Sequence, residues 1–183
     1  MQASSNPVLS TRRIVITAVL AAIAILLGAT RLGFIPVPNV SGNATIMHVP
    51  AIIGGILEGP WVGLLVGGIF GVYSMLQDTT GLFRNPLVSI VPRLFIGVTA
   101  YFAYISLRKS NEWLALVIAG VIGTLTNTVL VVAALIGLSL IPPAVVVTLI
   151  PQAIAEVIIA AIITVAVVVA WKRIDTGKGG SSV

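Results

Sequence analysis

Long runs of apolar residues, interrupted by short polar segments, follow one another along most of the 183-residue chain. A helix of about 20 apolar residues is long enough to cross the ~30 Å hydrocarbon layer of a membrane. Runs near that length predict six membrane-spanning helices. They are Ile14–Thr30, Ala44–Leu57, Trp61–Gln77, Leu87–Leu107, Trp113–Leu138 and Ala144–Trp171. The second and third runs are short and only Glu58-Gly59-Pro60 separates them, so they form either two tilted spans or one re-entrant hairpin.

The overall composition supports the same class of protein. Hydrophobic residues make up 58% of the chain, charged residues make up only 8%, and the mean hydropathy is +1.16. These values are typical of a membrane protein. We therefore expect an all-α integral membrane protein in which residues 1–183 form a single six-helix bundle surrounded by lipid. The polar tails Met1–Ser10 and Asp175–Val183 and the loop Leu32–Asn43 lie outside that bundle.

Lysine and arginine residues predict the orientation, because the cytoplasmic loops of membrane proteins are enriched in them. With the N-terminus inside, seven of these residues fall on the inner side, whereas only Arg31 and Arg84 fall on the outer side. The seven are Arg12, Arg13, Arg108, Lys109, Lys172, Arg173 and Lys178. Trp61, Trp113 and Trp171 also fall at the inner interface, as an aromatic belt requires. We predict that both termini are cytoplasmic, in a bacterial plasma membrane.

A few strongly polar residues lie within the apolar runs, where such residues usually face a partner, a cavity or a ligand. Arg93 lies about 10 Å below the outer end of the fourth predicted helix, at 1.5 Å per residue. Glu156 and Gln152 share one stripe of the sixth helix, Asn127 lies near the mid-depth of the fifth, and His48 lies towards the outer side of the second. We interpret these five residues as the candidate lining of one binding pocket.

The same residues also admit interpretations without a ligand. Arg93 and Glu156 form a buried ion pair between the fourth and sixth helices, or Arg93 receives an anionic group of a ligand that enters from outside. Both hold if the ion pair positions Arg93 for the ligand. Asn127 and Gln152 act either as hydrogen-bond links between helices or as ligand contacts, and His48 acts either in packing or in the pocket.

Several classes of chemistry are absent from the sequence. Because there is no cysteine, disulfides, thiol catalysis and cysteine-bound metals are excluded. No G-x-x-x-x-G-K-[ST] loop, no nucleophile motif and no His/Glu set with metal-ligand spacing occurs. An intramembrane enzyme with Glu156 as its base would lack a second catalytic group. The net charge of +5 does not indicate nucleic-acid binding, since the basic residues lie at segment ends. We predict no catalytic residue, no metal and no cofactor bound by this chain.

Small residues four positions apart indicate close helix contacts in a membrane. Gly63, Gly67 and Gly71 are expected to pack within the bundle. Ala18 and Ala22 form a flat face on the first helix, which serves either the bundle or another protein.

Two blocks of the sequence resemble the substrate-binding membrane subunits, or S components, of energy-coupling factor (ECF) vitamin transporters. The blocks are Ala44–Gly63, which contains GGILEGPWVG, and Asn85–Arg93, which reads NPLVSIVPR. The resemblance implies a subunit that captures a vitamin from outside and delivers it together with a transmembrane coupling protein and two cytoplasmic ATPases, which use the ATP. It also implies that Ala18 and Ala22 contact the coupling protein.

The family resemblance further implies a pocket built from the first outer loop, with Asn39 and Asn43, and from helices four to six. The NPLVSIVPR block looks most like the subunits assigned to pantothenate, whose single carboxylate would suit Arg93. Folate also carries carboxylates and is the nearest alternative. Riboflavin or thiamine would favour more aromatic residues than the 6% present. Outside transport, the alternative is a membrane scaffold whose polar groups only hold the helices together.

Overall fold

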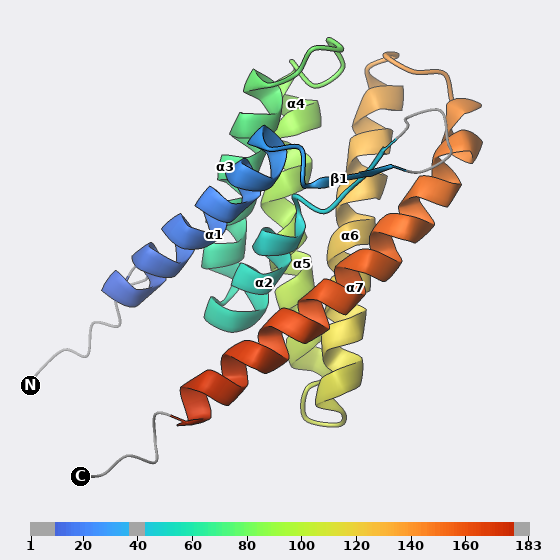
Figure 1. Ribbon diagram of the computed structural model, residues 1–183. Helices are drawn as coiled ribbons and strands as arrows, with labels where there is room; N and C mark the ends of the chain where they lie inside the picture. Colours follow the sequence, from blue (N-terminus) through green and yellow to red (C-terminus); the bar gives the residue numbers. More distant parts are fainter. Residues whose placement is uncertain (1–9, 37–42, 178–183) are drawn as a thin grey trace, which may run out of the picture.

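The computed structural model describes residues 10–36 and 43–177. Helices dominate these residues, and a short β-hairpin lies between the first two helices (Figure 1). The elements are α1 (Thr11–Ala29), β1 (Phe34–Pro36), β2 (Asn43–Thr45), α2 (Val49–Glu58), α3 (Pro60–Leu76), α4 (Pro86–Ser89), α5 (Val91–Leu107), α6 (Glu112–Gly137) and α7 (Val145–Gly177). All six predicted helical segments are present in this part of the chain, with α4 and α5 together making up the fourth.

Local sequence signals set the helix starts. The side chains of Ser10, Asn85 and Asn111 precede α1, α4 and α6 and accept hydrogen bonds from backbone N–H groups at 3.4, 2.9 and 3.0 Å. Such caps satisfy donors that the first turn of a helix leaves open. Prolines occupy the first or second position of α2, α3, α4 and α5, where a backbone N–H group has no acceptor within the same helix.

The second predicted helix, Ala44–Leu57, is wrong over its first five residues. Residues 43–45 form strand β2, which pairs antiparallel with β1, and α2 begins only at Val49. A short apolar run does not distinguish a strand from a helix, and Pro50 favours a helix start at this point. With 10 residues, α2 is about 15 Å long at 1.5 Å per residue and cannot cross the hydrocarbon layer by itself.

The fourth predicted helix is interrupted at Ile90, between α4 and α5. The cause is Pro92, which lacks the backbone N–H group that would continue the helical hydrogen bonds from α4 into α5. The interruption lies near the N-terminal end of the segment. It leaves the carbonyl oxygen of Val88 without the helical donor that residue 92 would otherwise supply.

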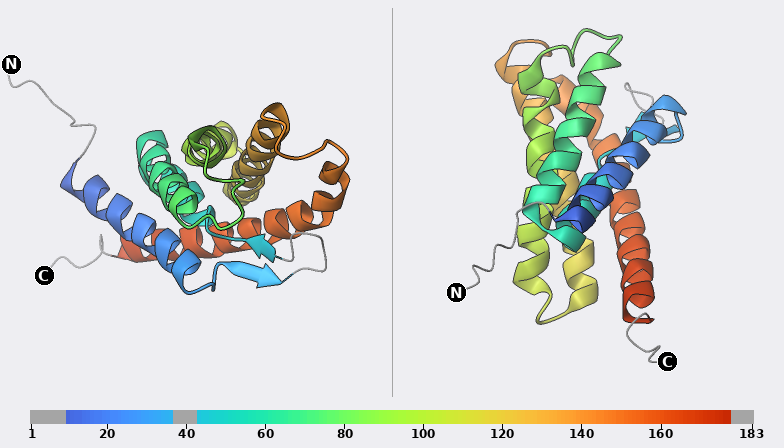
Figure 2. Two further views of the ribbon diagram at one scale, coloured as in Figure 1. Left: turned by 90° about the horizontal axis from the view of Figure 1, so that it is seen from above. Right: turned by 90° about the vertical axis from the view of Figure 1, so that its left-hand side faces the viewer.

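The helices form a bundle in which α3, α5 and α6 stand side by side and α7 crosses them obliquely (Figures 1 and 2). The start of α1, the α2–α3 turn, the α5–α6 turn and the end of α7 lie at one end of the bundle. The α3–α4 and α6–α7 connections lie at the other end. Strand β2 contacts α7, so the hairpin is tied to the side of the bundle that α7 forms.

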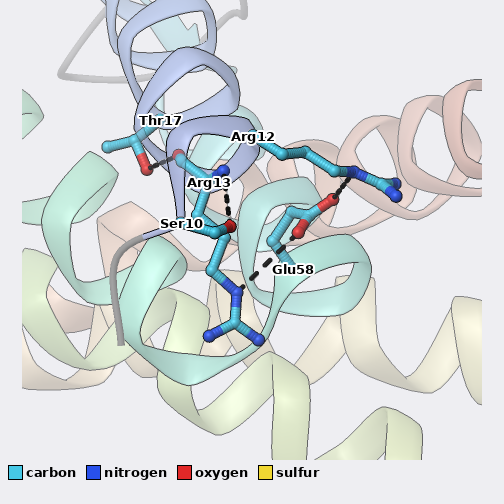
Figure 3. A network of polar contacts seen from close by, with 5 residues as sticks. All are labelled: Ser10, Arg12, Arg13, Thr17 and Glu58. Atoms are coloured by element: carbon cyan, nitrogen blue, oxygen red, sulfur yellow. Dashed lines mark hydrogen bonds and ion pairs between the residues drawn. The ribbon is translucent and has the colours of Figure 1, made fainter. Parts of the chain in front are cut away.

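The basic residues are distributed unequally between these two ends of the bundle. The basic residues predicted for the inner side flank the helix ends that lie together, and Arg31 and Arg84 flank the opposite ones, while Lys178 lies outside the described residues. Ion pairs link helices at the basic end. Glu58, the last residue of α2, contacts the Nε atoms of Arg12 at 3.1 Å and Arg13 at 3.9 Å (Figure 3).

Glycines let α3 and α5 approach closely. A Cβ atom at Gly67 would lie 2.0 Å from the carbonyl oxygen of Arg93, and one at Gly97 would lie 2.4 Å from the Cα atom of Gly63. A Cβ atom at Gly71 would likewise lie 2.7 Å from the carbonyl oxygen of Ser89. The predicted packing role of the α3 glycines is therefore confirmed.

Four helical segments among the described residues are long and apolar enough to cross a membrane: residues 11–29, 86–107, 112–137 and 145–174. The apolar helices α2 and α3 are shorter. Many large apolar side chains of these segments face outwards, among them Val19, Phe95 and Ile158. An apolar exterior of this kind suits lipid rather than water.

Candidate functional site

Glu156 is buried on the face of α7 that turns towards the bundle. Its Oε1 atom accepts hydrogen bonds from the backbone N–H of Thr45 at 2.8 Å and from Nε2 of Gln152 at 2.9 Å. At the same four-residue spacing along α7, Ala160 and Thr164 are also fully buried, whereas Thr148 near the start of the helix is exposed. Glu156 thus anchors the hairpin strand β2 onto α7.

His48 lies directly before α2 and is completely buried. Its Nε2 atom is 3.0 Å from the hydroxyl of Thr124 on α6, and this hydroxyl donates to the carbonyl oxygen of Gly120 at 2.9 Å. Because a hydroxyl carries only one proton, it must accept from His48, which assigns the proton of a neutral ring to Nε2. Nδ1 is then a hydrogen-bond acceptor, and it is buried without a partner.

Arg93 is only 5% exposed, in the first turn of α5. Its Nη1 atom donates to the carbonyl oxygen of Val88, and its guanidinium lies 5.6 Å from the ring centroid of Phe70 and 5.1 Å from that of Phe83. Its Nε atom is buried and has no hydrogen-bond partner.

The direct ion pair between Arg93 and Glu156 that the sequence left open is not formed among the described residues. Glu156 instead receives the hairpin amide and Gln152, and Arg93 turns back towards Val88. Arg93 and Glu156 therefore have separate hydrogen-bond partners and do not form an ion pair that links α5 to α7.

Asn127 is buried on α6, one turn beyond Thr124, and its Oδ1 atom has no hydrogen-bond partner. One turn further, Val131 packs in the same apolar cluster as Val88, whose carbonyl oxygen Arg93 contacts. This cluster packs α4, the short helix directly before the segment that carries Arg93, against α6. Asn127 lies 10 residues before the end of α6, so the site is about 15 Å from that end.

The chemistry of the site follows from the atoms that lack partners. Arg93 supplies a charged donor, and His48 and Asn127 supply neutral acceptors. Leaving such groups buried and unpaired costs ~1–3 kcal/mol each, so their presence calls for an explanation. Arg93 Nε is thus able to donate to an anionic acceptor, and His48 Nδ1 and Asn127 Oδ1 are able to accept from hydroxyl or amide donors. No group of three or more His, Cys, Asp or Glu side chains suited to a metal occurs among residues 10–36 and 43–177.

The structure does not describe the side chains of two predicted site residues, Asn39 and Asn43. Asn39 is outside the described residues, and Asn43 belongs to β2 without a described side chain. Conversely, sequence reasoning missed the backbone amide of Thr45 and the rings of Phe70 and Phe83. The amide leaves no side-chain signal, and an isolated phenylalanine in an apolar helix or loop looks like ordinary packing until its neighbour is known.

Comparison with known proteins agrees with this architecture. Residues 12–168 match the family described as "ECF transporter, substrate-specific component". The chain is an ECF transporter S component. Its family is therefore a class of transporter subunits that bind substrate, not a class of enzymes.

Individual relatives of this S component carry more specific names. The pantothenic acid transporter PanT of Lactococcus lactis subsp. cremoris (strain MG1363) is 30% identical over 158 residues, which cover 70% of this chain and 78% of that protein. The pantothenate transporter PanT of Leuconostoc mesenteroides subsp. mesenteroides is 33% identical over 114 residues, covering 55% of this chain and 56% of that protein.

A solved structure shares the fold of this S component. It is described as the structure and mechanism of the S component of a bacterial ECF transporter, with a TM-score of 0.63 and 18% sequence identity. The match covers 91% of this chain and 96% of the solved one. It establishes the arrangement of the helices, and the long apolar helices of the S component identify a membrane protein.

The S component also exposes the face predicted for partner docking. Ala18 and Ala22 are both on the outside of α1, whereas Thr17, Ala21 and Ala24 are buried against the bundle. The helix therefore has a small-residue face that the packing of this chain does not use.

Proposed function

We propose that this S component binds pantothenate from the outer side of a bacterial plasma membrane and delivers it by docking on a transmembrane coupling protein that works with two cytoplasmic ATPases. The names of its two relatives support the substrate. The family match supports the role in transport.

The observation that carries the proposal is the set of unpaired buried atoms, Arg93 Nε, His48 Nδ1 and Asn127 Oδ1. Pantothenate has one carboxylate, which accepts from Arg93 in a charge-assisted hydrogen bond. Its two hydroxyls and its amide N–H are donors for His48 and Asn127. Each group that is unsatisfied in the empty protein is thereby satisfied in the complex, which favours binding.

The electrostatic arrangement favours a monoanion. Arg93 faces the site as a cation, while Glu156 already receives the Thr45 amide and Gln152. A cationic vitamin such as thiamine would place its charge beside Arg93. Folate would bring two carboxylates to a site that offers a single arginine among the residues described around it, so we place it second.

Delivery requires a surface for the coupling protein, and α1 is our candidate. Its Ala18–Ala22 face is exposed and flat, which permits the close approach of another membrane helix. Glu58 holds the inner end of α1 through Arg12 and Arg13 (Figure 3). We assign Ala18 and Ala22 to docking on this basis, with ATP used by the partner subunits.

Equilibrium binding of labelled pantothenate to the purified protein tests the proposal. Unlabelled folate, riboflavin and thiamine serve as competitors. We expect tight binding that only unlabelled pantothenate displaces. Displacement by another vitamin would show that the site also accepts that vitamin. Absence of labelled pantothenate binding would contradict the proposed substrate and would favour a different vitamin or precursor.

A further inference from the structure

The guanidinium of Arg93 is held by contacts that originate in three separate segments. The first contact follows from Pro92. In a regular helix the N–H of residue 92 would donate to the carbonyl oxygen of Val88, but proline has no N–H group. The Nη1 atom of Arg93, the next residue, donates to that oxygen instead. The proline thus creates the acceptor that turns the arginine back along its own helix.

The second contact comes from the α3–α4 connection. The Asp78 carboxylate accepts hydrogen bonds from the N–H and hydroxyl of Thr80 at 2.9 and 2.7 Å and from the N–H of Phe83 at 3.1 Å. Burial alone raises the pKa of Asp78, but these hydrogen bonds outweigh it and lower the pKa below its usual value. Ser89 fixes the other side of the turn by donating to the carbonyl oxygen of Phe83.

This doubly fixed turn places the Phe83 ring 5.1 Å from the guanidinium carbon of Arg93. The third contact is Phe70 of α3, whose ring centroid lies 5.6 Å from the same carbon. Aromatic faces attract a cation and leave its in-plane hydrogen-bond donors free. The two rings therefore restrict where the guanidinium lies without occupying its N–H groups.

The remaining edge of the guanidinium carries Nε, which is buried and has no partner. A planar guanidinium with Nη1 already engaged offers its Nε–Nη2 edge to a carboxylate as a pair of parallel donors. We infer that Phe83 and Pro92 are positioning residues that hold Arg93 with its Nε edge directed at a ligand carboxylate, and so set the preference for an acid over the corresponding alcohol. This inference rests on the proposed function for the identity of the ligand.

The test compares pantothenate with pantothenyl alcohol, which has a hydroxymethyl group in place of the carboxylate. Affinities of both are measured for the wild type, Phe83→Leu, Phe83→Tyr and Pro92→Ala. We expect Phe83→Leu to reduce the preference for the acid about tenfold while the affinity for the alcohol changes little. Phe83→Tyr should retain the preference because it keeps an aromatic face, and Pro92→Ala should reduce it by restoring a competing N–H donor to Val88.

Phe95→Leu is the matched control, because Phe95 lies on the exposed side of α5 and is not one of the two rings that make cation–π contacts with Arg93 among the described residues. A second measurement needs no ligand. In ¹⁵N-arginine-labelled protein, the Arg93 Nε–H resonance, assigned through Arg93→Gln, should be sharp in the wild type and Phe83→Tyr. It should broaden or disappear in Phe83→Leu.

Each outcome bears on a different claim. An unchanged acid preference together with an unchanged Nε–H resonance in Phe83→Leu would overturn the positioning role. Loss of both, with rescue by Phe83→Tyr, would support it. A wild type that binds no pantothenate but shows the Phe83-dependent resonance would overturn the proposed substrate and leave the positioning of Arg93 supported.

Discussion

At the scale of single residues, the site combines buried polar atoms that are satisfied with others that are not. Glu156 accepts two hydrogen bonds, and Thr124 both accepts from His48 and donates to Gly120. Arg93 Nε and Asn127 Oδ1 have no partner. An unpaired donor or acceptor in an apolar interior reduces stability, so a ligand that completes its hydrogen bonds gains that free energy on binding.

Arg93→Gln removes the cation and keeps an amide of similar reach. Losing one partner of a buried charged hydrogen bond typically costs ~2–5 kcal/mol, so we expect pantothenate affinity to fall at least about thirtyfold. Equilibrium binding to the purified variant measures the change. Arg84→Gln is the control, since Arg84 is exposed in the α3–α4 connection. An equal loss in both variants would show a general charge effect and would exclude a specific role for Arg93.

At the scale of elements, the contact between α3 and α5 determines the position of Arg93. Gly67 lies against the backbone of Arg93 itself, because a Cβ atom there would be 2.0 Å from the Arg93 carbonyl oxygen. The close approach of these two backbones is possible only with glycine on α3. It also brings Phe70, one turn further along the same helix, within cation–π distance of the guanidinium.

Gly67→Ala tests this contact. The added methyl group meets backbone and not a flexible side chain, so α3 and α5 must separate, and overpacking of this kind costs ~1–3 kcal/mol. We expect a lower thermal unfolding temperature and weaker pantothenate binding. Gly137→Ala is the matched control, because a Cβ atom at Gly137 meets nothing within 4 Å. Equal stability of the two alanine variants would contradict the packing argument.

The exposed face of α1 gives a second prediction at this scale. Ala18→Trp and Ala22→Trp add bulk on the side of α1 that faces away from the bundle. We expect pantothenate binding to the isolated subunit to be unchanged and ATP-dependent uptake by cells to be lost, because the docking face is blocked. Ile158→Trp, on the exposed side of α7, controls for bulk at the lipid surface. Normal uptake in a variant with both alanines replaced would show that the Ala18–Ala22 face is not required for docking.

At the scale of the whole molecule, the site depends on segments far apart in the chain. Thr45 and Glu156 are 111 positions apart and His48 and Thr124 are 76 apart, yet each pair is joined by a hydrogen bond. The hairpin, α2, α6 and α7 are therefore held together through the site itself. A ligand bound among them should stabilise the complete fold and not one element.

Ligand-dependent stability follows from that arrangement. A ligand that binds only the folded protein stabilises it by about 2.7 kcal/mol at a concentration 100 times its Kd. We expect pantothenate to raise the unfolding temperature of the wild type, measured by a thermal shift in detergent, and to leave that of Arg93→Gln almost unchanged at the same concentration. A similar rise in both would place the binding site away from Arg93.

Some parts of the fold and the site could be predicted from local sequence, whereas others could not. The stripe of α7 was predictable because a four-residue spacing places Gln152, Glu156 and Ala160 on one face of any helix. The β-hairpin was not, since Ala44 and Thr45 begin the second apolar run in the sequence and pair only because β1 lies beside them. The contact partner of Arg93 was not predictable either, because a charge pattern does not specify whether Glu156, a carbonyl oxygen or an aromatic ring lies closest.

The sequence by itself determined the membrane class and which polar residues lie within the apolar segments, because apolar run length and buried polar side chains each carry a large free energy in lipid. The tertiary structure alone decided which of those polar atoms are paired. Glu156 is satisfied by a backbone amide from the hairpin, and Arg93 is turned by Pro92 and Phe83, leaving one edge free. Hydrogen bonds and cation–π contacts depend on distances of a few ångströms between distant segments, and only the folded chain sets those distances.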